Sequence, residues 1–300
     1  LGLRVVFVKK PFAAKFWQRG FDEKIFLVEN LRFWPGETKE DMNFARQLAR
    51  LGSFFVNDAF GAAHRRAASL TLLPKLLPSC LGLLFEKELR QLKKVAMKPR
   101  RPLVAIFGGA KLETKLPLLK RFIRLADKVA VGGAIANVLL RARGFEVGIS
   151  SAGATAGRDV KKIAHAKNVI LPVDVVAAPS RKSKSGKVCP IDRVRYRQTI
   201  LDIGPTTRKL FNQTIKSAGT IVWNGPLGLI EVSAFTRGTL SVARALARRQ
   251  KIVLVGGGDS IAFLDKIGLL KKFKHVSTGG GAMLAYLAGE ELPALAAFKK

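Results

Sequence analysis

The sequence has few cysteines, and the two that it contains lie far apart. Cys80 and Cys189 are the only cysteines in 300 residues, and neither belongs to a C-x-x-C pair or to another metal-binding spacing. This excludes a disulfide framework, a zinc cluster and a dithiol redox motif. The pattern is typical of a reducing compartment, and we expect both thiols to be inert and buried in the core.

Long hydrophobic runs are also absent. The longest apolar stretch, residues 69–85, contains Pro74, Lys75 and Pro78. Two prolines and a charge make it unsuitable as a membrane span, so we expect a loop that leads into a buried segment. The first ten residues do not resemble a signal peptide, and the chain begins at Leu1 while its first methionine is Met42. We therefore expect a fragment or a processed product.

Acidic residues are scarce relative to basic ones. The chain has 21 Asp and Glu residues against 53 Lys and Arg residues, which gives a formal net charge of +32. A site for a small phosphate-bearing ligand needs only a handful of cations, so most of this charge is left unexplained. A field of this strength attracts nucleic acid or acidic lipid in a salt-dependent way. A solvated basic surface without such a partner is the alternative, and the sequence leaves both open.

Short apolar runs alternate regularly with amphipathic stretches. With 48% hydrophobic residues, 300 residues can fill the core of one large α/β domain or of two moderate ones. Apolar runs that end in Gly, Asn or Asp predict strands, and apolar spacings of three and four predict helices. The predicted strands are residues 5–8, 25–28, 54–56, 103–107, 128–131, 169–171, 220–223, 252–255 and 275–277; the predicted helices are 41–51, 85–97, 116–125, 134–142, 206–217, 234–249 and 260–267. This order indicates parallel sheets covered on both faces.

A charged helix followed by a proline-rich turn marks the best domain boundary. The helical pattern at 85–97 runs into the turn KPRRP at 98–102, just before a buried strand. This is typical of an interdomain connector, so we predict domains at residues 1–90 and 91–290. In open parallel sheets ligands bind beyond the carboxyl ends of the strands, so chemistry is expected after each strand.

Two glycines and two lysines follow the strand at 103–107. Gly108 and Gly109 let the backbone approach a ligand, and the next helix offers free N–H groups and a partial positive charge. Lys111 and Lys115 are four residues apart, so we expect them on one face of the first turn of that helix. Two cations there oppose the helix dipole unless an anion lies between them. The pattern favours an anion site, although lysines in a first turn are common.

A second glycine-rich turn follows the strand at 252–255. Gly256, Gly257 and Gly258 can form a backbone cradle, and Ser260 can cap the following helix. Asp259 is placed where a carboxylate could hold Mg²⁺ beside phosphates. The alternative is an ordinary turn in which Asp259 caps the helix.

Three further strands end in turns of the same kind. These turns are Thr278-Gly279-Gly280-Gly281-Ala282, Gly132-Gly133-Ala134 with Asn137 beyond, and Asn224-Gly225-Pro226-Leu227-Gly228 with Glu231 beyond. One glycine pair is a weak signal, but five such turns in one domain are difficult to explain by loop chemistry alone. Together they favour a phosphate-rich ligand.

The first domain carries a different set of residues. The segment NDAFG at 57–61 follows a strand, and His64, Arg65 and Arg66 come next. An arginine guanidinium group can donate two parallel hydrogen bonds to a carboxylate or phosphate. An anion site for a second substrate is therefore one interpretation. A salt-bridged loop is the other, and a lone His64 is more often structural than catalytic. The sequence has no G-x-x-x-x-G-K-[ST] loop, no metal-ligand cluster and no Ser-His-Asp set.

Seven strings, taken together, resemble the phosphoglycerate kinase family. They are ENLRF at 29–33, VNDAFG at 56–61 with His64 and Arg65, GGAK at 108–111 with Lys115, LDIGP at 201–205, VWNGP at 222–226, GGGDS at 256–260 and STGGG at 277–281. The resemblance implies an α/β fold of two doubly wound parallel-sheet (Rossmann-like) domains joined by a connecting helix. It also implies that residues 291–300 return toward the first domain, and that the protein is a cytoplasmic monomer, although an organelle is compatible too.

The resemblance further implies a glycolytic phosphotransferase that moves phosphate reversibly from 1,3-bisphosphoglycerate to ADP, giving 3-phosphoglycerate and ATP, with Mg²⁺. Glu231 would hold the ribose, and Gly132 with Gly133 would line the adenine slot. The full set of implied roles is Lys111, Lys115, Gly280 and Gly281 in catalysis; Gly109, Lys111, Gly132, Gly133, Asn224, Glu231, Gly256, Gly257, Gly258, Asp259 and Ser260 in nucleotide binding; Arg65 in phosphoglycerate binding; and Asp259 in metal binding.

The sequence also departs from the family pattern. Family members carry a further N-terminal segment, with Asp, Asn and Arg side chains that contact the substrate, which this chain does not include. We therefore expect an incomplete first domain with an unpaired sheet edge and turnover near zero for this chain. Ala67 stands where the family usually has histidine, and Ala285 and Ala288 stand where acidic residues are common.

Two functions are compatible with these residues. A phosphoglycerate kinase is the leading interpretation, because the nucleotide-site residues are all present. The alternative is a catalytically dead protein of this fold whose basic surface binds RNA or a ribonucleoprotein. Only two tyrosines and three tryptophans occur, so the interleaving of aromatic and basic residues that single-strand readers use is missing.

Overall fold

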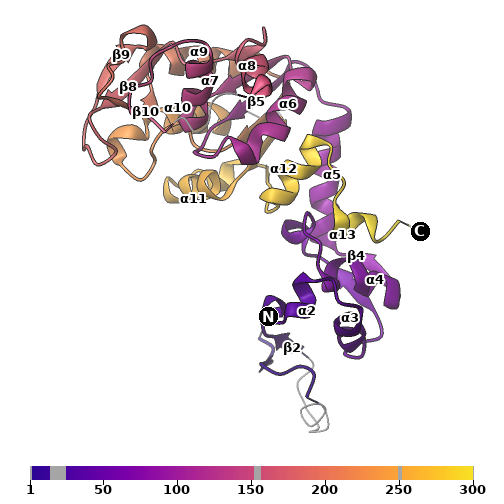
Figure 1. Ribbon diagram of the computed structural model, residues 1–300. Coiled ribbons are helices and arrows are strands. Elements are labelled where there is room, and N and C mark those ends of the chain that lie inside the picture. Colours follow the sequence, from indigo (N-terminus) through magenta and orange to yellow (C-terminus); the bar gives the residue numbers. More distant parts are fainter. Residues whose placement is uncertain (1, 14–24, 152–156, 249–251, 300) are drawn as a thin grey trace. The chain divides into compact units, whose positions relative to one another are not determined.

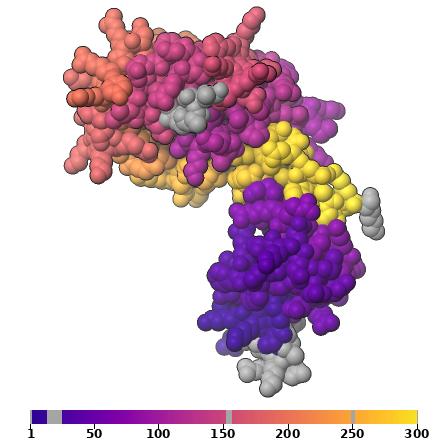
Figure 2. All heavy atoms as spheres, in the orientation of Figure 1, coloured from indigo at the N-terminus to yellow at the C-terminus, as the bar shows by residue number. Residues whose placement is uncertain are grey.

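The computed structural model describes residues 2–13, 25–151, 157–248 and 252–299 (Figure 1). The chain divides into two compact units. Unit 1 comprises Leu1–Glu86 together with Glu291–Lys300, and unit 2 comprises Lys87–Glu290. Figure 2 shows the heavy atoms of both units, coloured by residue number. Helix α5 (Leu83–Met97) carries the chain from unit 1 into unit 2.

Unit 2 is built on a six-stranded parallel sheet of order β13-β12-β11-β5-β6-β7. Its strands are β5 (Leu103–Phe107), β6 (Lys128–Val131), β7 (Val169–Ile170), β11 (Thr220–Asn224), β12 (Ile252–Gly256) and β13 (His275–Val276). All neighbouring pairs run parallel. Every residue of β5 and β11 is buried, as expected of apolar strands covered on both faces. The predicted fold class is confirmed.

Helices pack on both faces of this sheet, because successive strand residues point to opposite sides. On one face Ile106 and Trp223 share a buried core with Phe211 of α9. On the other face Phe107 meets Phe122 of α6, with ring centroids 5.4 Å apart. The helices of unit 2 are α6 (Leu116–Leu125), α7 (Gly133–Ala142), α8 (Arg158–Ala164), α9 (Pro205–Ser217), α10 (Arg237–Ala247), α11 (Gly258–Lys266) and α12 (Gly281–Ala288).

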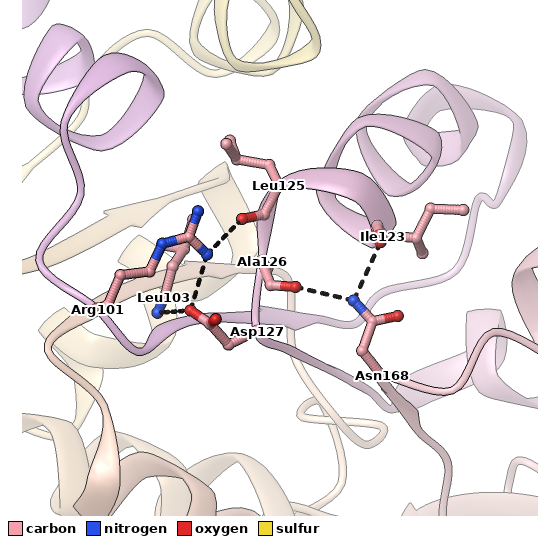
Figure 3. A network of polar contacts seen from close by, with 7 residues as sticks. All are labelled: Arg101, Leu103, Ile123, Leu125, Ala126, Asp127 and Asn168. Atoms are coloured by element: carbon pink, nitrogen blue, oxygen red, sulfur yellow. Dashed lines mark hydrogen bonds and ion pairs between the residues drawn. The ribbon is translucent and has the colours of Figure 1, made fainter.

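A polar network fastens the amino ends of β5 and β6 (Figure 3). The Arg101 guanidinium donates to the Leu125 carbonyl and to Asp127, each at 2.9 Å, and Asp127 also accepts the N–H of Leu103 at 2.6 Å. The Asn168 amide donates to two carbonyls at the end of α6, at 3.1 and 2.8 Å. The network therefore fixes the edge of the sheet opposite to the carboxyl ends of the strands.

A second sheet in unit 2 is antiparallel, with the order β10-β8-β9. Its strands are β8 (Asp174–Ala178), β9 (Lys187–Pro190) and β10 (Thr199–Ile203). The sequence patterns do not predict these strands, because β9 is mostly exposed and the apolar run of β10 is interrupted by Asp202. The Asp174 carboxylate accepts the N–H groups of Thr206 and Thr207, at 2.9 and 2.7 Å, and thereby ties this sheet to the start of α9.

Unit 1 contains two separate two-stranded parallel sheets in its described part. They pair β1 (Val5–Val8) with β2 (Ile25–Val28) and β3 (Phe55–Asn57) with β4 (Ser79–Leu81), beside α2 (Pro35–Thr38), α3 (Met42–Ala49), α4 (Leu73–Leu76) and α13 (Pro293–Ala296). Phe7, Leu27 and Val56 are 49%, 58% and 53% exposed. Apolar residues of these strands are therefore about half exposed, as is expected of two-stranded sheets with unpaired edges.

Two expectations about unit 1 and the cysteines are wrong. Residues 69–85 are not a loop: a π-helical turn (Ala68–Leu72), α4, β4 and the start of α5 succeed one another there, because Ala68 and Leu73 pack into the core of unit 1. The thiols are not core residues, since Cys80 is exposed on β4 and Cys189 is only partly buried. No helix in the described part of the chain is long and apolar enough to cross a membrane.

Candidate functional site

The carboxyl ends of β5, β6, β11 and β12 meet at one edge of the six-stranded sheet, because these strands are parallel. The turns that follow them are bonded to one another through the backbone. The N–H groups of Gly108 and Gly109 donate to the carbonyls of Asn224 (3.0 Å) and Pro226 (2.7 Å). The glycine-rich turns of β5 and β11 therefore form one continuous backbone surface.

Only glycine fits at two positions of this surface. A Cβ atom added to Gly108 would lie 2.0 Å from the Pro226 carbonyl oxygen. Gly225 has a φ of +92°, and a Cβ there would meet the Gly108 carbonyl oxygen and the Lys115 Nζ atom, both at 2.4 Å. The close approach of the two turns thus depends on the missing side chains.

Lys115 immediately precedes α6, and its side chain points back to the glycine turns. Its Nζ atom donates to the Gly108 carbonyl at 2.5 Å and lies 3.4 Å from the Asn224 carbonyl. Burial lowers the pKa of Lys115 to about 8, against the opposing effect of the Asp259 carboxylate. At neutral pH the site therefore holds a largely protonated ammonium group that is stabilised by carbonyl dipoles.

The prediction that Lys111 and Lys115 share the first turn of a helix is wrong. Lys111 lies in an irregular exposed segment, Glu113–Lys115 forms a 3₁₀ turn, and α6 begins at Leu116. Proline at position 117 favours this late start, because proline is suited to the first helical positions. The structure brings Lys115 against β5 and β11 and leaves Lys111 in solvent.

Asp259 lies in the first turn of α11, where its side chain is exposed. The N-cap residue of this helix is Gly257, so the alternative that Asp259 serves as the cap is wrong. Ser260 does not cap the helix either: its buried Oγ atom accepts the N–H of Gly225 at 2.9 Å. Asp259 and Glu231 both line one cavity at the carboxyl edge of the sheet.

Two buried side-chain amides at this edge lack a partner for one atom each. Asn224 is 1% exposed and its Nδ2 donor has no partner among the described residues; this atom lies beside Gly257. Asn137 is 2% exposed, lines the cavity, and has an unpartnered Oδ1 acceptor. Leaving such a group unsatisfied costs about 1–3 kcal/mol, which favours a site that a polar ligand completes.

Asp202 also lines the cavity, although the sequence did not single it out as a site residue. Burial raises the pKa of its carboxyl group to about 7, even though the N–H groups of Gly238 (2.8 Å) and Ile203 (2.9 Å) donate to it. The available signal was an acidic residue inside an otherwise apolar strand, and such a carboxyl group is a candidate for a functional role.

A buried glutamate that sequence reasoning missed holds the turn before α12. Glu88 of α5 accepts the N–H and the hydroxyl of Thr278, at 2.6 and 2.8 Å, and lies 3.1 Å from His275 Nε2. Burial alone would raise the pKa of Glu88, but these hydrogen bonds hold it below its usual value. The turn then passes Gly280, with φ +45°, and α12 begins at Gly281.

Arg65 and His64 belong to unit 1. Arg66 Nε lies 2.7 Å from Glu40 Oε2, so for Arg66 the structure shows the salt bridge that the sequence offered as the alternative to an anion site. Arg65 is exposed and forms no salt bridge within the described residues. Burial, together with the charge of Arg65, lowers the pKa of His64. Arg65 is thus the arginine of this loop that is available to an anion.

These features define a class: a doubly wound α/β protein with a site for a phosphate-bearing ligand at the carboxyl edge of its parallel sheet. Glycine turns, a cation and an exposed carboxylate converge there. None of the described residues forms a group of three or more His, Cys, Asp and Glu side chains that would hold a metal ion by itself.

Comparison with known proteins identifies the family. Residues 1–290 match the family described as phosphoglycerate kinase. Similar proteins with that name occur in Pelotomaculum thermopropionicum (43% identity over 282 residues, 92% of this chain and 72% of that protein) and Rubrobacter xylanophilus (44% over 275 residues, 91% and 70%). Phosphoglycerate kinase structures from Coxiella burnetii (TM-score 0.83, 36% identity, covering 97% of this chain and 77% of that one) and Pyrococcus horikoshii (0.85, 31%, 98% and 78%) are similar in fold. The chain belongs to the phosphoglycerate kinase family.

Family membership makes the chain a phosphotransferase of glycolysis that uses ATP and ADP. The leading interpretation of the sequence is confirmed. The comparisons give no support to the alternative of a catalytically dead RNA-binding protein.

Proposed function

We propose that the carboxyl edge of the unit 2 sheet holds the nucleotide and the transferred phosphate in the reversible reaction between 1,3-bisphosphoglycerate and ADP. The expectation that this chain by itself turns over slowly stays a prediction. The observation that carries this assignment is the position of Lys115. Its ammonium group lies against the carbonyls of Gly108 and Asn224 and in the field of Asp259. A cation held between glycine turns suits the oxygen atoms of a phosphate chain, which can approach the backbone closely there.

Lys115 supplies positive charge where phosphate is transferred. Phosphoryl transfer asks the protein for positioning and charge neutralisation rather than for covalent chemistry. Because Lys115 is partly buried, its attraction to phosphate is stronger than that of a lysine in water. Lys111, which is exposed, contacts the phosphates from the solvent side.

Asp259 holds the magnesium ion of the nucleotide. Mg²⁺ is commonly bound by one or two carboxylates together with substrate phosphates and water, and not by a cage of protein ligands. The residues present fit this mode, because Asp259 is an exposed carboxylate on the cavity wall beside the glycine turns of α11. When bound, the ion neutralises charge on the phosphates.

Backbone groups and neutral side chains position the rest of the nucleotide. Gly256 to Ser260 contact the phosphates through the start of α11, and the free Nδ2 donor of Asn224 completes this contact. Glu231 holds the ribose. Gly132 and Gly133 line the adenine slot with Gly109, which shares its cavity with Gly133.

Two further sets of residues are assigned to the acidic substrate and to the phosphate that it exchanges. Arg65 binds the phosphoglycerate through its guanidinium fork. Gly280 and Gly281, at the start of α12, direct N–H groups toward the charge that develops on the transferring phosphate.

Titration calorimetry of ADP, with and without Mg²⁺, tests the metal assignment. We expect the intact chain to bind ADP more tightly with Mg²⁺, and Asp259→Ala to lose this enhancement. Asp265→Ala is the matched control, because Asp265 is an exposed aspartate of the same helix that does not line the cavity. It should keep the full Mg²⁺ effect. If Asp259→Ala retains the enhancement, Asp259 is not the metal ligand.

A further inference from the structure

Helices α9 and α10 pack against each other and contain no acidic residue. Their basic residues are Arg208, Lys209 and Lys216 on α9, and Arg237 and Arg244 on α10, with Arg248 directly after it. The apolar side of both helices is buried in the unit 2 core through residues such as Phe211 and Val242. The cations are therefore restricted to the opposite, outward side.

The two helices enclose a groove of about 490 Å³ on that side. Arg208, Arg237, Arg244 and Arg248 line it, and a hydrogen bond of 2.9 Å from Asn212 to Ser241 joins the two helices within it. An adjoining hollow shares Arg208, Asn212 and Ser241 and continues past Lys209 and Lys216. Among the described residues, no Asp or Glu lines either part.

Among the described residues, the charge of the groove is offset only in part, by the effect of the Asp202 carboxylate on Arg208. In the part of the chain that the structure describes, no salt bridge reaches Arg208, Arg237, Arg244 or Arg248. Like charges gathered in one groove repel one another, and an anion that enters relieves this repulsion. Arginine also presents a fork of donors that matches phosphate oxygens in pairs.

The groove is separate from the nucleotide site. Its lining shares no residue with the cavity that contains Asp259 and Glu231. That cavity lies at the strand ends, whereas the groove runs between the outward sides of α9 and α10. A small phosphate-bearing substrate therefore does not account for it.

We propose that the α9–α10 groove binds the sugar-phosphate backbone of single-stranded RNA, in addition to the kinase activity. A row of cations along a groove can follow the phosphates of a single nucleic-acid strand. No aromatic residue lines the groove in the described part of the chain, so we expect binding to depend on phosphates and not on base sequence. This gives a use to part of the +32 charge that the nucleotide site leaves unexplained.

Other polyanions fit the groove less well. Neither helix exposes a large hydrophobic side chain, so the apolar anchor of a membrane-binding helix is missing from them. Of the described residues that line the groove, Leu240 and Ala245 are the apolar ones, so an acidic peptide would find few pockets for its side chains. A polynucleotide requires neither feature.

Fluorescence anisotropy with a labelled oligouridylate of about 20 nucleotides tests this inference between about 50 and 200 mM salt. The groove variant carries Arg237→Gln, Arg244→Gln and Arg248→Gln. The control carries Lys161→Gln, Lys162→Gln and Lys167→Gln, which remove the same charge from exposed positions on and just after α8. Neither set touches the nucleotide site, so calorimetry with ADP should give the parent affinity for both and show that both are folded.

The groove variant should bind the RNA about tenfold or more weakly, and its slope of log affinity against log salt should fall by about 2, or about 0.7 for each lost phosphate contact. The control should change by less than about twofold. Equal losses in both variants would mean that net charge alone attracts RNA, and would overturn the proposal. So would no RNA binding at low salt, or groove-dependent binding of anionic phospholipid vesicles in its place.

Discussion

The buried ammonium group of Lys115 sets the pH range in which the site can attract phosphate. Burial lowers the pKa of this lysine to about 8, so the free protein loses the charge as the pH rises through that value. Below it the cation is present. The carbonyls of Gly108 and Asn224 accept hydrogen bonds from it, and the Asp259 carboxylate opposes the effect of burial, so the ammonium group is still largely protonated at neutral pH.

We therefore expect the affinity for MgADP to fall by about tenfold or more between pH 7 and pH 10, the loss expected for one charge-assisted contact. Calorimetry across this range measures it. Lys115→Gln should bind weakly at pH 7 and lose the pH dependence. Lys120→Gln, on the exposed side of α6 in an ion pair with Asp159, should behave like the parent. An affinity of the parent chain that stays constant to pH 10 would contradict the role of Lys115.

Single residues show what a sequence can predict at this scale. The gathering of these residues at one edge of the sheet was predictable, because the carboxyl ends of parallel strands meet there. Their exact contacts were not. The spacing of Lys111 and Lys115 indicated a shared helix face, but the helix starts after both, and only the folded chain shows that Lys115 turns back to Gly108. Glu88 and Asp202 were missed because their burial depends on distant segments.

At the scale of elements, strands with continuous apolar runs were predictable. The bounds of β1, β2, β5 and β6 and of helix α6 agree with the predicted ranges, because each combines a clear pattern with a clear stop. The antiparallel sheet of β8, β9 and β10 was not predicted. Its strands contain polar and charged residues whose partners, such as Thr207 for Asp174, lie in other elements.

The glycine turns can be tested at the scale of elements, because two of their positions should require glycine for different reasons. Gly108 is required by the fold: a Cβ there would collide with the Pro226 carbonyl. Gly258 is different, since a Cβ would meet nothing within 4 Å and the residue begins α11. The fold of the free protein therefore does not require glycine at position 258. A phosphate chain that approaches the backbone closely would require it.

Gly108→Ala should therefore lower the unfolding free energy by about 1–3 kcal/mol, as overpacking does. Gly258→Ala should leave stability unchanged or slightly higher, because alanine favours a helix by up to about 1 kcal/mol, and yet weaken MgADP by about tenfold. Thermal unfolding and calorimetry on the two variants separate these effects. Unchanged nucleotide affinity in Gly258→Ala would count against phosphates at the start of α11.

At the scale of the whole molecule, the two units differ in the size of their sheets. Unit 2 has a six-stranded sheet with both faces covered, whereas the described part of unit 1 has two-stranded sheets with half-exposed apolar residues. The alternation of strand and helix patterns indicated the α/β class and composition indicated the basic character, but neither could say which surface of the fold carries the charge. The α9–α10 groove depends on the way two helices pack, which composition does not encode.

The central claim is that the glycine-lined edge of the unit 2 sheet, with Lys115 and Asp259, binds a magnesium nucleotide. A crystal structure of the chain with MgADP tests it most directly. The phosphates should lie over the ends of β5, β11 and β12, with Lys115 Nζ within about 3 Å of a phosphate oxygen and Asp259 bound to the metal. Nucleotide density in another place, or none at a saturating concentration, would contradict the account.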